Sequence, residues 1–261
     1  MESINNDDIV LNKFKIALEG YGISIDSIDD TGLIYISRGD TTLKVSLDNV
    51  RRGFERDRDE SHISDLVRAI VNYTIELPDN WEDAKDDIFV AITPSDREFA
   101  NFVHIPLTDM CHKVYTYYNG NNFSWISAED LSKWGISQEE LSDQADKNID
   151  RLAETASITV DEIHGRKLVF IETEYVSLKA SMLFSLKMKN KINSELGLPF
   201  YAVIPVRDFC YIFSQSDFDF FSARLGSTVV KEYQNSGYPI TTEILKFTDE
   251  GVSAMGNYPV D

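Results

Sequence analysis

Two helix-start signals follow one another within residues 123–152, and they restrict what this chain can fold into. Ser127 is followed three residues later by Asp130, and Ser137 is followed three residues later by Glu140. A hydroxyl and a carboxylate at this spacing can each accept a hydrogen bond from a backbone N–H group that would otherwise stay free at a helix N-terminus. The sequence therefore predicts a short helix followed directly by a longer one.

The longer helix is predicted to be amphipathic. Apolar residues recur every three or four positions along it and form one stripe: Leu141, Ala145, Ile149 and Leu152. Acidic residues occupy the opposite face, among them Asp143, Asp146 and Asp150. Two interpretations of this acidic face remain open. We favour a solvated helix surface, and the alternative is a patch that meets a basic partner protein.

Four β-hairpins are predicted, because pairs of short apolar segments enclose turn signals. Three of them turn at Arg38–Asp40, at Asn119–Asn121 and at His164–Gly165. The fourth is formed by Phe200–Ile204 and Phe209–Phe213, and it places Arg207 and Asp208 at an exposed tip.

Helical periodicity accounts for most of the remaining chain. The predicted helices are one capped by Asn6 or Asp7, one over residues 63–71, one over Ser177–Glu195 and one over Asp217–Gln234. We therefore expect an α+β fold in which antiparallel β-hairpins pack against amphipathic helices. The patterns are weakest over Leu77–Thr93. The stretch before Thr108 suggests a division into an N-terminal helix-hairpin-helix lobe of residues 1–107 and a C-terminal α+β lobe of residues 108–261, or else one continuous domain.

Net charge excludes several kinds of partner. The 261 residues carry 44 acids against 25 bases, a formal charge of −19, and 43% of them are hydrophobic. The hydrophobic content suffices for a folded core. The negative charge argues against a nucleic-acid partner and against binding to anionic membranes, because both need clustered Lys and Arg, whereas a basic protein partner remains compatible with it.

The expected location is the cytoplasm. The chain starts without a basic segment followed by an apolar one, and no stretch approaches the ~20 apolar residues of a membrane span. The only two cysteines are Cys111 and Cys210, and Cys210 lies in an apolar run that suits a buried, reduced thiol.

Signatures of catalysis and cofactor binding are missing from the sequence. There is no phosphate-binding loop, no dinucleotide fingerprint and no zinc-ligand spacing. Cys111 and His112 are adjacent, but neighbouring residues on a strand point to opposite faces, so they would be poor joint ligands. We expect no cofactor and no metal, and the balance favours a protein that is not an enzyme.

Several segments resemble a bacterial protein family. The run W-I-S-A-E-D-L-S-K-W-G-I-S-Q-E-E-L at residues 125–141, with Ala145 and Asn148, is similar to a segment shared by YtpQ-like proteins. Further similar patches are S-L-D-N-V with Arg51, Arg52 and Phe54 after it, A-V-I-P-V-R-D at Ala202–Asp208, and Tyr238–Ile240. The patches extend over about residues 43–252. The family has no assigned chemistry, so the resemblance implies a soluble bacterial protein and transfers no catalytic residues.

Arg207 and Asp208 are the sharpest site candidates, because the resemblance includes them and a fixed arginine can hold a carboxylate or phosphate through two parallel hydrogen bonds. The simpler interpretation is an ion pair that shapes the hairpin turn.

Three functions are compatible with these features. We favour a non-enzymatic binding or interaction protein with an acidic surface. The alternatives are an immunity-type inhibitor of a basic toxin, using Asp143, Asp146 and Asp150, and a hydrolase or transferase with a site near Arg207 and Asp208.

Overall fold

The computed structural model describes residues 8–38, 41–71, 77–96, 99, 101–120, 123–236 and 238–260. The chain divides into two compact units, residues 1–76 with 120–122 and residues 77–119 with 123–261. The boundary expected from the sequence, between residues 107 and 108, lies inside the second unit. The reason is that strand β4, Ile88–Pro94, pairs antiparallel with strand β6, Cys111–Tyr118, along its whole length.

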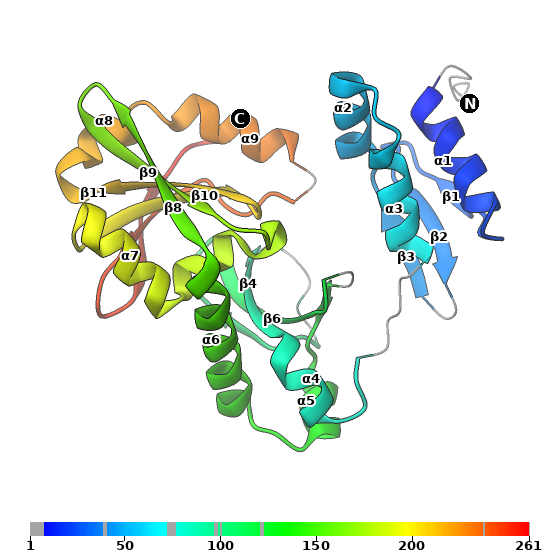
Figure 1. Ribbon diagram of the computed structural model, residues 1–261, viewed down its shortest axis with the longest axis horizontal. Helices are drawn as coiled ribbons and strands as arrows, with labels where there is room; N and C mark the ends of the chain where they lie inside the picture. Colours follow the sequence, from blue (N-terminus) through cyan, green and yellow to red (C-terminus); the bar gives the residue numbers. More distant parts are fainter. Residues whose placement is uncertain are drawn as a thin grey trace. The chain divides into compact units, whose positions relative to one another are not determined.

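The first unit packs three helices with a small antiparallel sheet of order β1-β2-β3 (Figure 1). Its elements are α1 Ile9–Glu19, β1 Ser27–Ile28, β2 Ile34–Arg38, β3 Thr41–Val45, α2 Asp48–Asp57 and α3 Ser61–Val71. Phe14, Leu18 and Ile36 are fully buried in its core. Asp8 caps α1 by accepting a hydrogen bond from the backbone N–H of Leu11. The expected caps Asn6 and Asp7, like Gly39 and Asp40 of the predicted β2–β3 turn, lie outside the described residues.

The second unit contains two antiparallel sheets. In the smaller sheet, β6 pairs with β4 on one side and with β5, His104–Pro106, and β7, Phe123–Trp125, on the other. The larger sheet has the order β13-β12-β10-β11-β9-β8. Its strands are β8 Ser157–Ile163, β9 Arg166–Glu172, β10 Phe200–Val206, β11 Phe209–Ser214, β12 Glu243–Phe247 and β13 Val252–Asn257. The β8–β9 and β10–β11 hairpins are confirmed.

Six α-helices and several short 3-10 turns complete the second unit among its described residues. The helices are α4 Trp81–Ala84, α5 Ala128–Trp134, α6 Gln138–Thr155, α7 Leu186–Leu196, α8 Phe218–Ser222 and α9 Gly226–Asn235. Both predicted capping boxes are present, at Ser127 with Asp130 and at Ser137 with Glu140. The α+β class with antiparallel sheets is therefore confirmed.

Two predicted helices are shorter than expected. The segment before Leu186 forms 3-10 turns, and α7 begins only after Ser185, whose hydroxyl accepts a hydrogen bond from the N–H of Met188. The helix expected over residues 217–234 is split into α8 and α9. The N–H groups of Arg224 and Leu225 both bond to the carbonyl of Phe221, which closes a turn between the two helices.

The central strand β10 is buried on both faces, as expected for a continuous apolar run. Phe200, Ala202 and Ile204 belong to one core cluster, and the alternate residues Tyr201 and Val203 belong to another. The strand was expected to stop before Pro205, but it continues to Val206. Its pairing with β11 is irregular between Val203 and Val206, and such irregularities tolerate a proline within a sheet.

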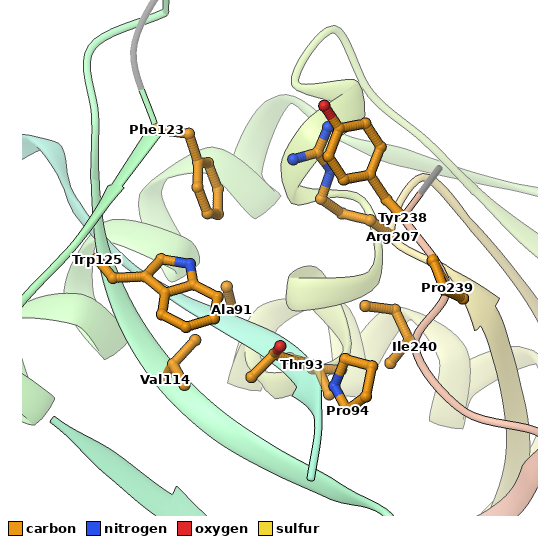
Figure 2. A pocket seen from close by; sticks show the side chains of 11 residues that line it. Ala91, Thr93, Pro94, Val114, Phe123, Trp125, Arg207, Tyr238, Pro239 and Ile240 are labelled. Atoms are coloured by element: carbon orange, nitrogen blue, oxygen red, sulfur yellow. The ribbon is translucent and has the colours of Figure 1, made fainter. Parts of the chain in front are cut away.

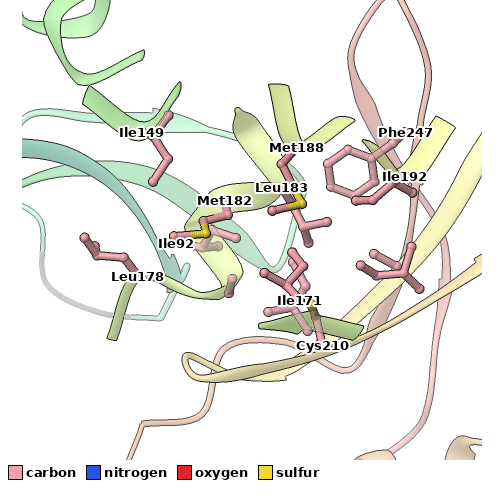
Figure 3. Close-up of a cluster of buried hydrophobic side chains, with 14 of the residues drawn as sticks. Ile92, Ile149, Ile171, Leu178, Met182, Leu183, Met188, Ile192, Cys210 and Phe247 are labelled. Atoms are coloured by element: carbon pink, nitrogen blue, oxygen red, sulfur yellow. The ribbon is translucent and has the colours of Figure 1, made fainter. Parts of the chain in front are cut away.

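The larger core cluster joins both sheets of the second unit into one body. It combines Ile92 of β4 with Ile149 of α6, Met188 of α7, Cys210 of β11 and Phe247 of β12 (Figure 3). Two buried polar side chains, Asn148 and Glu243, add hydrogen bonds between its elements. No helix in the described part of the chain is both long enough and apolar enough to cross a membrane.

Candidate ligand pocket around Arg207

A cavity of about 200 Å³ lies in the second unit, with Arg207 at its edge (Figure 2). Three strand regions and two connecting segments supply its walls. The lining residues share an apolar or aromatic character apart from Arg207 and Thr93: Ala91, Ile92, Thr93, Pro94, Val114, Phe123, Trp125, Arg207, Tyr238, Pro239 and Ile240.

Backbone hydrogen bonds hold together the part of the pocket that contains Arg207. Val206 and Pro239 form an isolated antiparallel bridge, and the N–H of Ile240 donates to the carbonyl of Pro205 at 2.9 Å. The N–H of Arg207 donates to the carbonyl of Tyr238 at 3.3 Å. The segment Tyr238–Ile240 therefore lies against the end of β10 and is bonded to it through the backbone.

Within the described chain, the Arg207 side chain contacts aromatic rings and no acid. Its guanidinium carbon lies 4.0 Å from the ring centroid of Tyr238 and 5.4 Å from that of Phe123. The carbonyl of Arg207 also accepts a hydrogen bond from the N–H of Ala180 at 3.2 Å, so the backbone is held on both sides. Among the residues that the structure describes, no side chain or backbone group accepts a hydrogen bond from the guanidinium. A fixed cation with free donors therefore stands beside an apolar cavity.

Asp208 points to a different part of the unit. It is exposed and does not line the cavity, whereas Arg207 is half-buried. Within the described chain the two side chains form no ion pair, so the turn does not depend on one. The expectation of an exposed tip thus holds for Asp208 but not for Arg207.

Near Asp208, a partly buried carboxyl on α9 has an altered acidity. Burial, reinforced by the negative charge of Asp208, raises the pKa of Glu232 above its usual value of 4.5, although a hydrogen bond from the Tyr211 hydroxyl at 2.7 Å opposes the shift. The second carboxyl oxygen of Glu232 is buried and accepts no hydrogen bond from any described residue.

This altered pKa predicts a pH-dependent effect of Glu232→Gln. The pKa of Glu232 is higher in the folded protein than in the unfolded chain. The contribution of this carboxyl to the free energy of unfolding is therefore complete below the unfolded-state pKa and is lost as the pH rises through the folded-state pKa. The neutral amide should therefore raise the free energy of unfolding by about 0.5 kcal/mol at pH 7 and leave it almost unchanged at pH 4. Urea unfolding at both pH values measures this, with the exposed Glu250→Gln as control. An equal change at both pH values would contradict the ionisation argument.

The three acids of α6 that were expected to form a patch have different surroundings. Asp143 is exposed. Asp146 pairs with Lys113 at 3.3 Å. Asp150 accepts hydrogen bonds from the hydroxyl of Ser185 at 2.6 Å and from the N–H of Lys187 at 3.3 Å, so it binds the N-terminus of α7. Two of the three acids therefore take part in contacts within the chain.

The adjacent residues Cys111 and His112 point into separate environments. Cys111 is buried, and burial raises the pKa of its thiol to about 12. The imidazole of His112 contacts the rings of Phe99 and His104, at centroid distances of 4.7 and 5.1 Å. In the described part of the chain, no three His, Cys, Asp or Glu side chains gather as metal ligands.

The sequence predicted Arg207 as a site residue but not the aromatic walls beside it. Phe123 and Trp125 are two positions apart on β7, a spacing that places two side chains on one face of a strand. That spacing was the signal in the sequence from which an aromatic wall could have been predicted. Nothing in the sequence indicated that Tyr238 would meet Arg207, since the contact depends on the bridge between residues distant in the chain.

No protein-family model, no curated protein and no solved structure matches this chain. The resemblance to YtpQ-like proteins therefore stays a prediction.

Proposed function

We propose that this protein binds a small ligand in the pocket beside Arg207 without transforming it. The observation that carries the proposal is the guanidinium of Arg207, which is held against Tyr238 and Phe123 and has no acceptor among the described residues. Small-molecule sites are typically apolar cavities with a few fixed polar groups that orient the ligand. The pocket has this composition.

The chemical groups around the cavity favour binding over catalysis. Its described lining contains no carboxyl, imidazole, thiol or amine side chain. The imidazole and carboxyl groups that most often perform general acid–base catalysis are thus absent from the described lining, and Tyr238 supplies its one phenol. The hydrolase or transferase alternative also requires Asp208 in the pocket, and Asp208 lies outside its lining.

The acidic face of α6 gives less support to an immunity-type inhibitor. Such a function needs carboxylates that are free to meet a basic partner. Asp146 and Asp150 are engaged within the second unit, and Glu154 pairs with Lys187 of α7. We therefore base the proposal on the pocket.

The resemblance to YtpQ-like proteins also includes parts of this pocket. Its segments at residues 125–141, Ala202–Asp208 and Tyr238–Ile240 contribute Trp125, Arg207 and the wall that Arg207 contacts through Tyr238. Membership of that family is part of the proposal, and it predicts that its members share the pocket.

Extraction of bound small molecules tests the proposed function. The protein is purified without denaturation from cells, then denatured, and the released molecules are compared by mass spectrometry. We expect a molecule that accompanies the wild-type protein and decreases at least tenfold in Arg207→Gln.

Arg224→Gln is the matched control. The guanidinium carbon of Arg224 also lies 4.0 Å from an aromatic ring centroid, that of Phe220, but Arg224 is exposed and does not line the cavity. This variant should retain the ligand at the wild-type level. Equal retention by Arg207→Gln, with circular dichroism showing both variants folded, would contradict the proposal.

A further inference from the structure

We infer that the ligand of this pocket is a small monocarboxylate with a flat, apolar body. The inference rests on the proposed function and names the chemical class that the pocket would select. Three properties of the site lead to it: the charge of its lining, the donors that the lining offers and the size and character of its walls.

The charge of the lining favours a single negative charge on the ligand. Arg207 is the one ionised side chain among the described lining residues, in a chain whose formal charge is −19. A monoanion would neutralise it, whereas a neutral or cationic ligand would leave the guanidinium without a partner in a partly apolar site. Such an unpaired charge is unfavourable.

The donors of Arg207 fit a carboxylate. The contacts with Tyr238 and Phe123 place aromatic rings around the guanidinium and leave its N–H groups without protein acceptors in the described part of the chain. A guanidinium presents two parallel N–H donors that match the two oxygens of a carboxylate. The backbone of Arg207 is fixed through both its N–H and its carbonyl group, which reduces the entropy lost when the ligand is bound.

A phosphate would require more donors than the described lining provides. Phosphate sites usually combine several backbone N–H groups at a helix N-terminus with basic side chains. Here the lining comes from strands and connecting segments, with one cation and no helix N-terminus among its described residues. A phosphate dianion would keep an excess negative charge in this site.

The walls favour a flat apolar body of limited size. Trp125, Phe123 and Val114 lie on one side of the cavity, and Pro239 and Ile240 lie on the other (Figure 2). The volume of about 200 Å³ is smaller than the ~300–1,000 Å³ of pockets for drug-sized ligands. A single six-membered ring with a carboxylate is therefore a suitable probe.

Titration with three related probes tests the ligand class. Benzoate carries the carboxylate, benzamide is its neutral analogue of nearly equal shape, and phenyl phosphate replaces the carboxylate with a phosphate. Binding to the full chain is measured by isothermal titration calorimetry at constant ionic strength. We expect saturable binding of benzoate, with both other probes at least tenfold weaker.

Two substitutions of the same arginine separate charge from geometry. Arg207→Gln should weaken benzoate binding at least tenfold and benzamide binding much less, because the neutral amide carbonyl accepts a weaker hydrogen bond than a carboxylate does. The affinity of Arg207→Lys for benzoate should lie between those of the wild type and Arg207→Gln, because lysine keeps the charge but not the two parallel donors. Arg224→Gln should bind benzoate as the wild type does, and circular dichroism establishes that each variant is folded.

Different failures have different meanings. Equal affinity for benzoate and benzamide, tighter binding of phenyl phosphate, or no binding of benzoate would each overturn the monocarboxylate class. If the extraction experiment nevertheless yields a molecule that depends on Arg207 and lacks a carboxyl group, the proposed binding function stands and only the ligand class is wrong. Failure of both experiments would overturn both proposals.

Discussion

Replacing Asn148 with leucine is expected to lower the free energy of unfolding of the second unit by about 2–3 kcal/mol. Asn148 lies on α6 and is 2% exposed. Its side-chain amide donates hydrogen bonds to the carbonyls of Lys85 and Ile88, at 2.6 and 2.8 Å, and thus attaches α6 to the start of β4. Leucine has a similar size but no donor, so two buried hydrogen bonds are lost while most of the packing volume is kept.

Gln144→Ala is the control for Asn148→Leu. Gln144 donates to the side-chain oxygen of Asn148 at 3.0 Å, and its removal leaves both bonds from Asn148 to the backbone in place. The expected loss is below about 1 kcal/mol. Urea denaturation followed by tryptophan fluorescence measures both variants. Equal losses in the two would show that the attachment of α6 to β4 does not depend on the Asn148 amide donors.

Glu243→Ala is expected to lower the free energy of unfolding by about 3 kcal/mol. Glu243 lies on β12 in the larger sheet and is 4% exposed. One of its carboxylate oxygens accepts hydrogen bonds from the hydroxyls of Thr108 and Thr241, at 2.5 and 3.1 Å. The Thr108 hydroxyl itself accepts from the N–H groups of Met110 and Cys111, so its proton is available only for an acceptor such as Glu243.

The effect is large because Glu243 connects two sheets. Thr108 belongs to the turn between β5 and β6 of the smaller sheet. Alanine would leave the buried Thr241 hydroxyl and the half-buried Thr108 hydroxyl without the carboxylate as acceptor, and it would also open a small cavity. Glu243→Gln keeps an acceptor oxygen and should lose about 1 kcal/mol, and Glu250→Ala on the exposed β12–β13 turn should change stability by less than about 0.5 kcal/mol. A Glu243→Ala variant as stable as Glu250→Ala would contradict the proposed connection.

Local signals in the sequence predicted much of the second unit. Both serine capping boxes act within four residues, and the β8–β9 turn uses His164 and Gly165, which adopt the positive φ angles of 53° and 75° that a tight hairpin needs. These features depend on neighbouring residues only. They can therefore be inferred without knowledge of the rest of the fold.

The fold elements that were predicted with wrong bounds depend on contacts between distant residues. A helix over Ser177–Glu195 was expected from periodicity, but Ser185 caps α7 and also donates to Asp150 of α6, a residue distant in the sequence. β4 pairs with β6 across the expected boundary at residues 107/108, so this position lies inside one unit. In both cases, contacts between separate segments determined where an element begins.

The pocket was predictable only in part for the same reason. Arg207 could be identified as a fixed arginine in a hairpin turn. Its aromatic neighbours Phe123 and Tyr238 come from segments far apart in the chain, and the sequence alone does not place them together. Asp208 was expected to belong to the same site as Arg207, but the side chains of these two adjacent turn residues point to different surroundings.

The distribution of tryptophan and cysteine determines what simple spectroscopic probes can report. All three tryptophans, Trp81, Trp125 and Trp134, and both cysteines lie in the second unit. Intrinsic tryptophan emission and the reaction of thiols with an alkylating reagent therefore follow the opening of that unit alone. The unfolding of the first unit is silent in both signals, and far-ultraviolet circular dichroism would reveal it as a separate transition if the two units unfold independently.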